Sequence, residues 1–146
     1  KVEAEEPEIT IDINVSSYIP EEYIENASQK IEIYQDIANC RSEEDINNVI
    51  DEIIDRYGEM PIEVNNLIEI AKIKNLCRDK KVIKVQTRPM GIVFTFTDLL
   101  PEAISKILAI YKNKVQFSAM GKPYVTYKIT ENQDTLTAIK GFLKSI

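Results

Sequence analysis

Histidine is absent from the 146-residue sequence, which removes the commonest general base and the commonest metal ligand. Serine–histidine and cysteine–histidine catalysis are therefore excluded within this chain. Glycine occurs only 4 times. Neither of the glycine-rich phosphate-binding patterns, G-x-x-x-x-G-K-[ST] or G-x-G-x-x-G, is present. The sequence thus lacks the usual motifs for binding a nucleotide or for activating a nucleophile.

Cysteine and long apolar runs are also scarce. The 2 cysteines, Cys40 and Cys77, are too far apart for a C-x-x-C motif, which excludes a zinc ribbon and a thioredoxin-type site. We expect both thiols to be buried and reduced, as in a cytoplasmic protein. No apolar run approaches the ~18 residues of a membrane span, and no signal peptide opens the sequence. These features predict a cytoplasmic protein without a membrane partner.

The length and the apolar fraction of 44% are sufficient for one domain with its own core. The chain begins KVEAEEPEI, without methionine and rich in glutamate. This start predicts a fragment of a longer protein, with residues 1–7 as a linker remnant and residues 8–146 as the domain.

The net charge of −6 is unevenly distributed. Residues 1–70 contain 4 basic and 19 acidic side chains, a net charge of −15, whereas residues 71–146 contain 14 basic and 5 acidic ones, a net charge of +9. Such asymmetry indicates either that one half meets a basic partner or that the two halves face each other.

The first half predicts one strand and three helices. EITIDINV, residues 8–15, alternates apolar and polar side chains, as a half-buried strand does. Pro20 predicts the start of a helix that ends near Cys40, with Glu21 and Glu22 in its first turn, where the helix dipole favours anions. The buried face predicted for this helix consists of Tyr23, Ala27, Ile31, Tyr34 and Ala38.

A second helix is predicted to follow Ser42, a favourable N-cap residue with Asp45 three positions later. Gly58 can adopt the left-handed conformation that ends a helix, and Pro61 predicts the first residue of a third helix. Helical spacing places the apolar residues of the second helix on one stripe: Ile46, Val49, Ile50, Ile53, Ile54 and Tyr57.

The second half is rich in β-branched and aromatic residues. It predicts strands at 82–86 and 91–97 with a turn at TRPM, then a helix over 101–112. Strands at 115–119 and 124–129 and a helix over 134–143 follow. The fold class is therefore α+β, with an N-terminal strand and a three-helix segment followed by a ββα-ββα half with a small sheet.

Three charged residues, Glu52, Asp55 and Arg56, are predicted on the outer side of the second helix. Glu52 precedes Arg56 by four residues, the favourable orientation for an intrahelical ion pair. These residues could form a docking patch for an oppositely charged surface or simply a solvated face. A metal site at Asp51 and Asp55 is disfavoured, because the residues are exposed next to Arg56 and no calcium-binding loop is present.

A second concentration of charge is basic and could bind nucleic acid. The cations of a helix C-terminus also complement the helix dipole, so a purely structural role explains several of them. The residues are Lys72, Lys74, Arg78, Lys80, Lys81, Lys84 and Arg88.

Two segments carry a resemblance to a known family: SYIPEEYIENASQKIEIYQDIA and EEDINNVIDEIIDRYGEMPIEVNNLIEIAKIK. They resemble the C-terminal, TRCF domain of bacterial transcription-repair coupling factors. The most specific signal is DRYG with a proline three residues after the glycine. The resemblance covers residues 8–80, with Lys30 in place of the usual arginine and Tyr57 in place of the usual phenylalanine. The β-rich remainder agrees in length and layout.

The resemblance implies a parent protein that is an ATP-driven DNA translocase. Such a protein removes stalled RNA polymerase and recruits the excision-repair protein UvrA. ATP, magnesium and DNA are bound by other domains, so no enzyme activity and no cofactor are expected in this monomeric fragment. The domain itself is implied to be a regulatory clamp that covers the UvrA-binding module of the same protein. The residues implicated in that contact match Glu52, Asp55 and Arg56. The alternative is an accessory module that binds nucleic acid or RNA polymerase through the basic second half.

Overall fold

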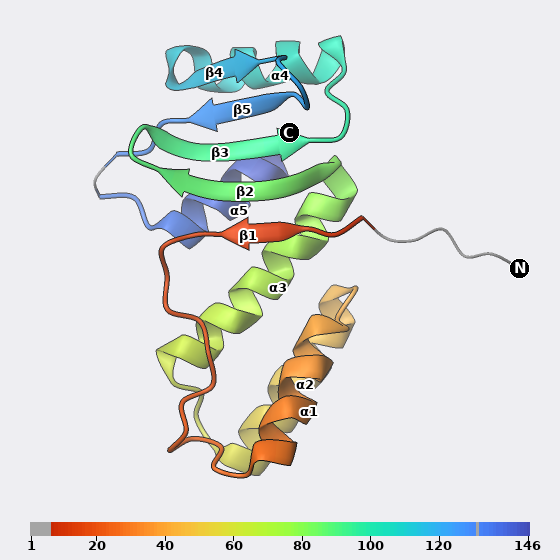
Figure 1. Ribbon diagram of the computed structural model, residues 1–146, viewed down its shortest axis with the longest axis vertical. Coiled ribbons are helices and arrows are strands. Elements are labelled where there is room, and N and C mark those ends of the chain that lie inside the picture. The colour runs from red at the N-terminus through yellow and green to blue at the C-terminus, as the bar shows by residue number, and fades with distance from the viewer. Residues whose placement is uncertain (1–6, 131) are drawn as a thin grey trace, which may run out of the picture. The chain divides into compact units, whose positions relative to one another are not determined.

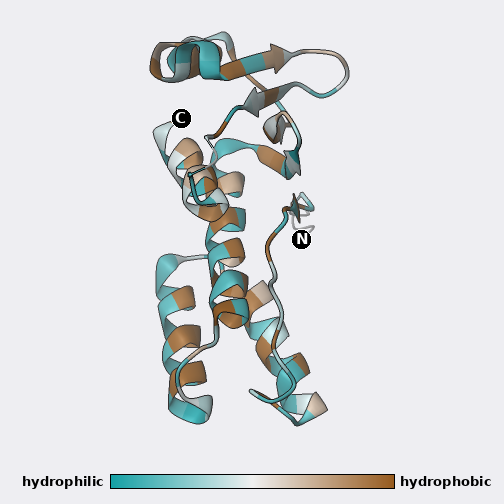
Figure 2. Ribbon diagram, turned by 90° about the vertical axis from the view of Figure 1, so that its left-hand side faces the viewer, coloured by the Kyte–Doolittle hydropathy of each residue, from teal (hydrophilic) through white to brown (hydrophobic). Residues whose placement is uncertain are grey.

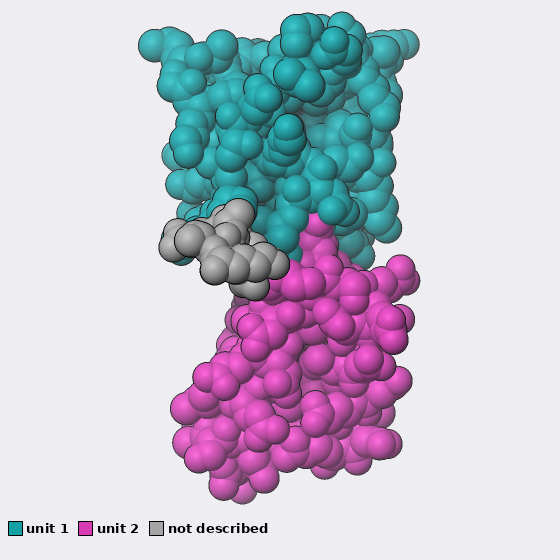
Figure 3. All heavy atoms as spheres, turned by 90° about the vertical axis from the view of Figure 1, so that its right-hand side faces the viewer, with its two compact units in different colours: residues 1–14, 76–146 teal, residues 15–75 magenta. Residues whose placement is uncertain are grey.

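The computed structural model describes residues 7–130 and 132–146, and the chain falls into two compact units (Figure 3). The helical unit consists of residues 15–75 and the sheet unit of residues 1–14 and 76–146. Residues 1–6 of the predicted linker lie outside the described residues. The boundary between linker and domain therefore stays a prediction.

Three helices supply the core of the helical unit: α1 (Ala27–Ala38), α2 (Glu43–Tyr57) and the first part of α3 (Ile62–Lys80). Helices α1 and α2 carry hydrophobic and hydrophilic residues on different sides (Figure 2). The apolar side chains are sequestered together, which is the main favourable contribution to folding. This cluster contains Ile19, Ile24, Ile33, Ile37, Cys40, Ile46, Ile53, Val64, Ile68 and Ala71.

The predicted start of the first helix at Pro20 was wrong. The Pro20 carbonyl instead closes a turn by accepting hydrogen bonds from the backbone N–H groups of Tyr23 and Ile24. The helix begins at Ala27, where the Asn26 side chain accepts a hydrogen bond from the N–H of Gln29 at 3.0 Å. An asparagine cap satisfies a helix N–H that no backbone carbonyl can reach, so it prevailed over the proline signal.

The predicted buried face of this helix was wrong for the same reason. Tyr23, which set the predicted phase, lies outside α1, so the helical spacing was counted from a residue in a turn. Ile31 is 57% exposed, whereas Ile33 and Ile37 are buried. The helix is therefore rotated from the expected orientation, and the exposed Glu32 directly precedes the buried Ile33.

The ββα-ββα order of the second half is confirmed, and with it the α+β fold class. The first repeat contains β2 (Val82–Arg88), β3 (Gly91–Phe96) and α4 (Pro101–Tyr111). A short 3-10 turn over Lys112–Lys114 leads to β4 (Val115–Ser118), β5 (Tyr124–Tyr127) and α5 (Thr135–Ser145).

The predicted strand at 8–15 is confirmed only in its centre, as β1 (Thr10–Asp12). It pairs in parallel with β2, and the remaining pairs are antiparallel, so the sheet is mixed with the order β1-β2-β3-β5-β4. The register joins Thr10 to Lys84 and Asp12 to Gln86, so three residues of this segment pair with β2.

One face of the sheet is covered by α4 and α5, which lie behind the strands in Figure 1 and to their left in Figure 2. Phe94 of β3 stacks on Phe142 of α5 with 4.2 Å between ring centroids. Tyr127 of β5 contacts the rings of both Tyr111 and Phe142. Burial alternates strictly along β3 and β5, so the opposite face carries the less buried side chains.

Candidate functional site

Helix α2 holds the candidate residues, and its two ends are fixed by local chemistry. The Ser42 hydroxyl accepts a hydrogen bond from the Asp45 N–H at 3.1 Å, and the Asp45 carboxylate accepts one from the Arg41 N–H at 3.0 Å. The predicted cap is thus confirmed. At the other end Gly58 has φ +87°, a conformation that L side chains rarely adopt. Its carbonyl accepts a hydrogen bond from the Tyr23 hydroxyl at 2.6 Å.

Burial of Ile46 and Ile53 on one side of α2 directs the opposite side to solvent. Glu52, Asp55 and Arg56, here called the charged face, are all exposed as predicted. Among the described residues Asp55 has no ion-pair partner within 4.0 Å. The charged face can therefore meet another surface without disturbing the core of the helical unit.

Arg56 is the centre of a small ion-pair network. Its Nη1 lies 3.7 Å from Oε1 of Glu52, which confirms the predicted intrahelical pair, and 3.7 Å from Oε1 of Glu32 on α1. The guanidinium carbon also lies 5.1 Å from the ring centroid of Tyr57. Exposed pairs of this length contribute at most about 1 kcal/mol. The guanidinium is thus oriented by its neighbours without being tightly bound to them.

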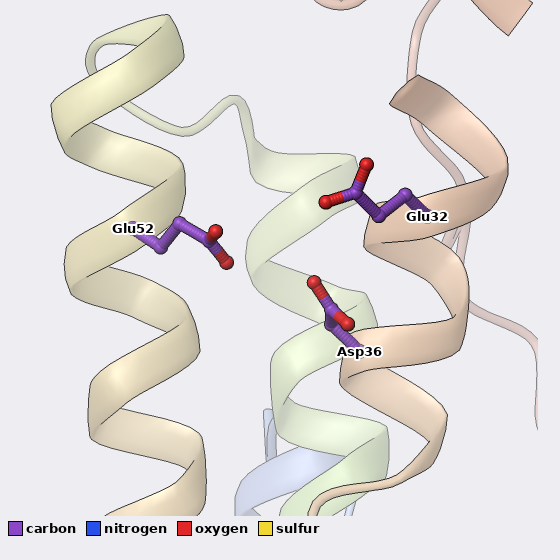
Figure 4. Close-up of side chains that lie close together, drawn as sticks. All are labelled: Glu32, Asp36 and Glu52. Carbon is purple, nitrogen blue, oxygen red and sulfur yellow. The ribbon is translucent and has the colours of Figure 1, made fainter. Parts of the chain in front are cut away.

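Figure 4 shows Glu32 and Asp36 of α1 opposite Glu52 of α2. One carboxylate oxygen from each lies within 4.8 Å of the others, and we call these three residues the acidic cluster. Such a cluster can attract a cation, whether a metal ion or the side chain of a lysine or arginine. It differs from the Asp51 and Asp55 pair considered from the sequence, which lies on α2 alone.

Sequence reasoning missed Glu32 and Asp36 because it placed the wrong side of α1 in the core. The signal was nevertheless present, since Ile33 and Ile37 are spaced four apart as in a buried helical stripe. Recognition of Asn26 as the cap would have fixed this phase and placed Glu32 beside α2.

The two cysteines are free and buried, as predicted. Burial raises the pKa of Cys77 to about 12, although the neighbouring Arg78 acts to lower it. Burial and the nearby carboxylates of Asp45 and Asp36 raise the pKa of Cys40, whose thiol donates to the Asp36 carbonyl at 3.3 Å. Both groups are therefore thiols at neutral pH and poor nucleophiles.

The basic residues singled out from the sequence are divided between the two units. Lys72 and Lys74 belong to the helical unit, and the Lys72 ammonium lies 2.9 Å from Oε2 of Glu69. Lys84 and Arg88 belong to β2 in the sheet unit. No helix in the described part of the chain is long and apolar enough to span a membrane.

The model of the TRCF domain family matches residues 13–107, a range that includes α2 and its charged face. The chain belongs to the TRCF domain family. This confirms the resemblance found in the sequence segments around α1 and α2.

Individual relatives agree with this assignment. The TRCF-family chain is 32% identical to a transcription-repair-coupling factor of Rickettsia conorii over 88% of its length, and 31% identical to one of Staphylococcus aureus over 99%. The matches span only 12% and 13% of those relatives. A crystal structure of the C-terminal domain of a transcription-repair coupling factor has the same fold, with a TM-score of 0.81 and 23% identity, covering 95% of this chain and 89% of the other.

Proposed function

We propose that this TRCF domain is the C-terminal regulatory domain of a transcription-repair coupling factor. The parent is an ATP-driven DNA translocase that removes stalled RNA polymerase and recruits UvrA. The domain acts by covering the parent's UvrA-binding module. The observation that carries this proposal is the family match across residues 13–107, which contains the whole of α2.

The charged face supplies the covering contact in this proposal. Glu52, Asp55 and Arg56 offer two carboxylates and one guanidinium on a rigid, capped helix. Charged contacts contribute specificity and can separate in water, whereas a large apolar interface would remain closed. This chemistry suits a contact that must open when UvrA is to be recruited.

Arg56 gives the contact a way to exchange partners. In the domain alone it has two carboxylates at 3.7 Å, from Glu52 and Glu32. Both ion pairs are long and partly exposed, so losing them on docking costs little free energy. A carboxylate of the UvrA-binding module could replace them with a closer, two-pronged hydrogen-bonded pair, which is the stronger arrangement for arginine.

The test uses the full-length parent and measures its affinity for UvrA. Replacement of Glu52, Asp55 and Arg56 by alanine should increase this affinity toward that of a parent lacking residues 8–146. Breaking a desolvated charged contact costs about 2–5 kcal/mol, enough to open a tethered contact substantially. Alanine at Glu21 and Glu22, two exposed acids outside α2, is the control and should leave the affinity unchanged.

Two outcomes are informative in opposite ways. A truncated parent that binds UvrA no better than the intact one would refute covering by this domain. A truncated parent that binds better, beside a folded triple variant that does not, would show that covering uses residues other than the charged face.

A further inference from the structure

The sheet face left uncovered by α4 and α5 has an ordered pattern of side chains, which the strand register defines. Arg88 lies opposite Gly91, and the backbone N–H of Lys128 donates to the Lys114 carbonyl at 2.8 Å. A Cβ atom on Gly91 would lie 3.2 Å from the Lys128 Cα, so these residues are neighbours across the sheet. They form one row across the end of the sheet, in which Lys128 directly follows β5 and Lys114 ends the 3-10 turn before β4: Arg88, Gly91, Lys128 and Lys114.

Two further rows follow at intervals of two residues, because alternate side chains share a face. We call the three rows together the open sheet face. The middle row consists of Asp12, Gln86, Val93, Thr126 and Gln116, and the last row consists of Thr10, Lys84, Thr95, Tyr124 and Ser118.

Charge on the open sheet face is almost entirely positive. Its four cations are Lys84, Arg88, Lys114 and Lys128, and its one carboxylate is Asp12. Three of the cations lie in the first row and are exposed. Sequence reasoning had singled out Lys84 and Arg88 but not Lys114 and Lys128, which strand pairing brings into the same row.

Gly91 leaves a gap in the cationic row. It has φ +141°, and a Cβ would lie 2.4 Å from the Tyr127 carbonyl oxygen, so only glycine fits. The side chains of Arg88 and Lys128 are consequently separated by two strand spacings, about 10 Å, with bare backbone between them. An anionic group can approach this backbone closely while both cations reach it from the sides.

Apart from Asp12 and Lys84, which lie toward β1, the remaining rows carry uncharged side chains, which suit bases better than further phosphates. Tyr124 is 36% exposed and offers an aromatic surface, and its neighbours are neutral side chains that donate and accept hydrogen bonds. Sheet-face RNA-binding modules use this combination, with aromatic rings that stack on bases and cations that follow the backbone. An acidic polypeptide would use the cations but would gain nothing from the ring.

We propose that the open sheet face binds single-stranded nucleic acid, with phosphates at Arg88, Lys114 and Lys128 and a base stacked on Tyr124. This site lies in the sheet unit and uses none of the residues of the charged face. It therefore stands or falls independently of the proposed covering of the UvrA-binding module.

The direct test is fluorescence anisotropy of a labelled oligothymidine mixed with the 146-residue chain over a range of salt concentrations. Replacement of Arg88, Lys114 and Lys128 by glutamine should weaken binding. It should also reduce the slope of log affinity against log salt by about 2, since each phosphate contact to a single strand contributes about 0.7. The matched control replaces three cations of the covering helices by glutamine: Lys106, Lys140 and Lys144. It makes the same change in net charge and should leave the slope within about 0.7 of the wild-type value.

Tyr124 distinguishes a nucleic acid from other anions. Tyr124→Ala should weaken oligothymidine binding about tenfold, whereas Tyr124→Phe should retain it, because stacking needs only the ring. Equal effects of the two triple variants would refute the proposal. Tighter binding of a duplex of the same length would also refute it. A third refuting result would be that poly-glutamate binds as tightly as oligothymidine and that Tyr124→Ala leaves oligothymidine binding unchanged.

Discussion

Ile53 and Ile54 are adjacent on α2 but have opposite environments, and this difference tests the orientation of the charged face. Ile53 is 0% exposed, whereas Ile54 is 46% exposed. The sequence placed both in one apolar stripe. Alanine at each position removes the same atoms from the same helix, so the pair forms a matched comparison.

The expected magnitudes follow from burial. Ile53→Ala removes roughly three carbon groups worth about 0.8 kcal/mol each, and a cavity penalty is added because Ile53 is surrounded. The free energy of unfolding should fall by about 3–4 kcal/mol. Ile54→Ala loses about half of the transfer contribution and leaves no cavity. Alanine is also the better helix former by a few tenths of a kcal/mol, so the loss should stay below about 1 kcal/mol.

Urea unfolding followed by far-ultraviolet circular dichroism measures both variants. The chain has two units, which can unfold in separate transitions. The two variants are therefore compared in the transition that Ile53→Ala shifts. Equal losses in the two variants would refute the orientation of α2 described here. The charged face would then no longer be assigned to the solvent side of the helix.

Three other predictions concern single sites. Thiol titration of Cys40 and Cys77 should be slow in the native protein and fast in denaturant, and a disulfide found by mass spectrometry without added oxidant would contradict this. Asp134 caps α5, and its hydrogen bonds from Thr137 lower the pKa of its carboxyl group. Its contribution is therefore present above the ordinary pKa of 3.8 and is lost as the pH falls through the lower folded pKa. Asp134→Ala should cost about 0.5–2 kcal/mol at neutral pH, and the difference from wild type in urea titrations should shrink in acid. Gly91→Ala should lower the thermal midpoint strongly, because its Cβ would lie 2.4 Å from a backbone oxygen; an unchanged midpoint would disprove this close approach.

Helix α2 was predictable because its signals are local. The cap at Ser42, the end at Gly58 and the spacing of Ile46 and Ile53 each depend on residues within a few turns of one another. The strands of the second half were also predictable, since β-branched and aromatic runs alternate with turn residues. Local chemistry thus determined the elements and the exposure of the charged face.

The acidic cluster and the cationic row were not predictable in the same way. Glu32 meets Arg56 only because α1 packs beside α2 with one particular phase. Lys128 and Lys114 lie beside Gly91 only because β5 pairs with both β3 and β4. These sites depend on register and helix rotation, which the periodicity of one element does not contain.

The charge asymmetry of the sequence follows the division into units. The helical unit contains 5 basic and 14 acidic side chains, a net charge of −9, whereas the sheet unit, residues 1–14 and 76–146, contains 13 basic and 10 acidic ones, a net charge of +3. Salt weakens both kinds of contact, so salt dependence alone cannot separate the proposed functions of the two units.

Variants can separate them, because the two proposed surfaces share no residue. Alanine at Glu52, Asp55 and Arg56 should alter UvrA affinity of the parent while leaving oligothymidine binding by the 146-residue chain unchanged. Glutamine at Arg88, Lys114 and Lys128 should weaken oligothymidine binding by the 146-residue chain and leave the UvrA affinity of the parent unchanged. If either triple variant alters both affinities while circular dichroism shows an intact fold, the two units are energetically coupled. The two proposed surfaces would then be linked sites rather than independent ones.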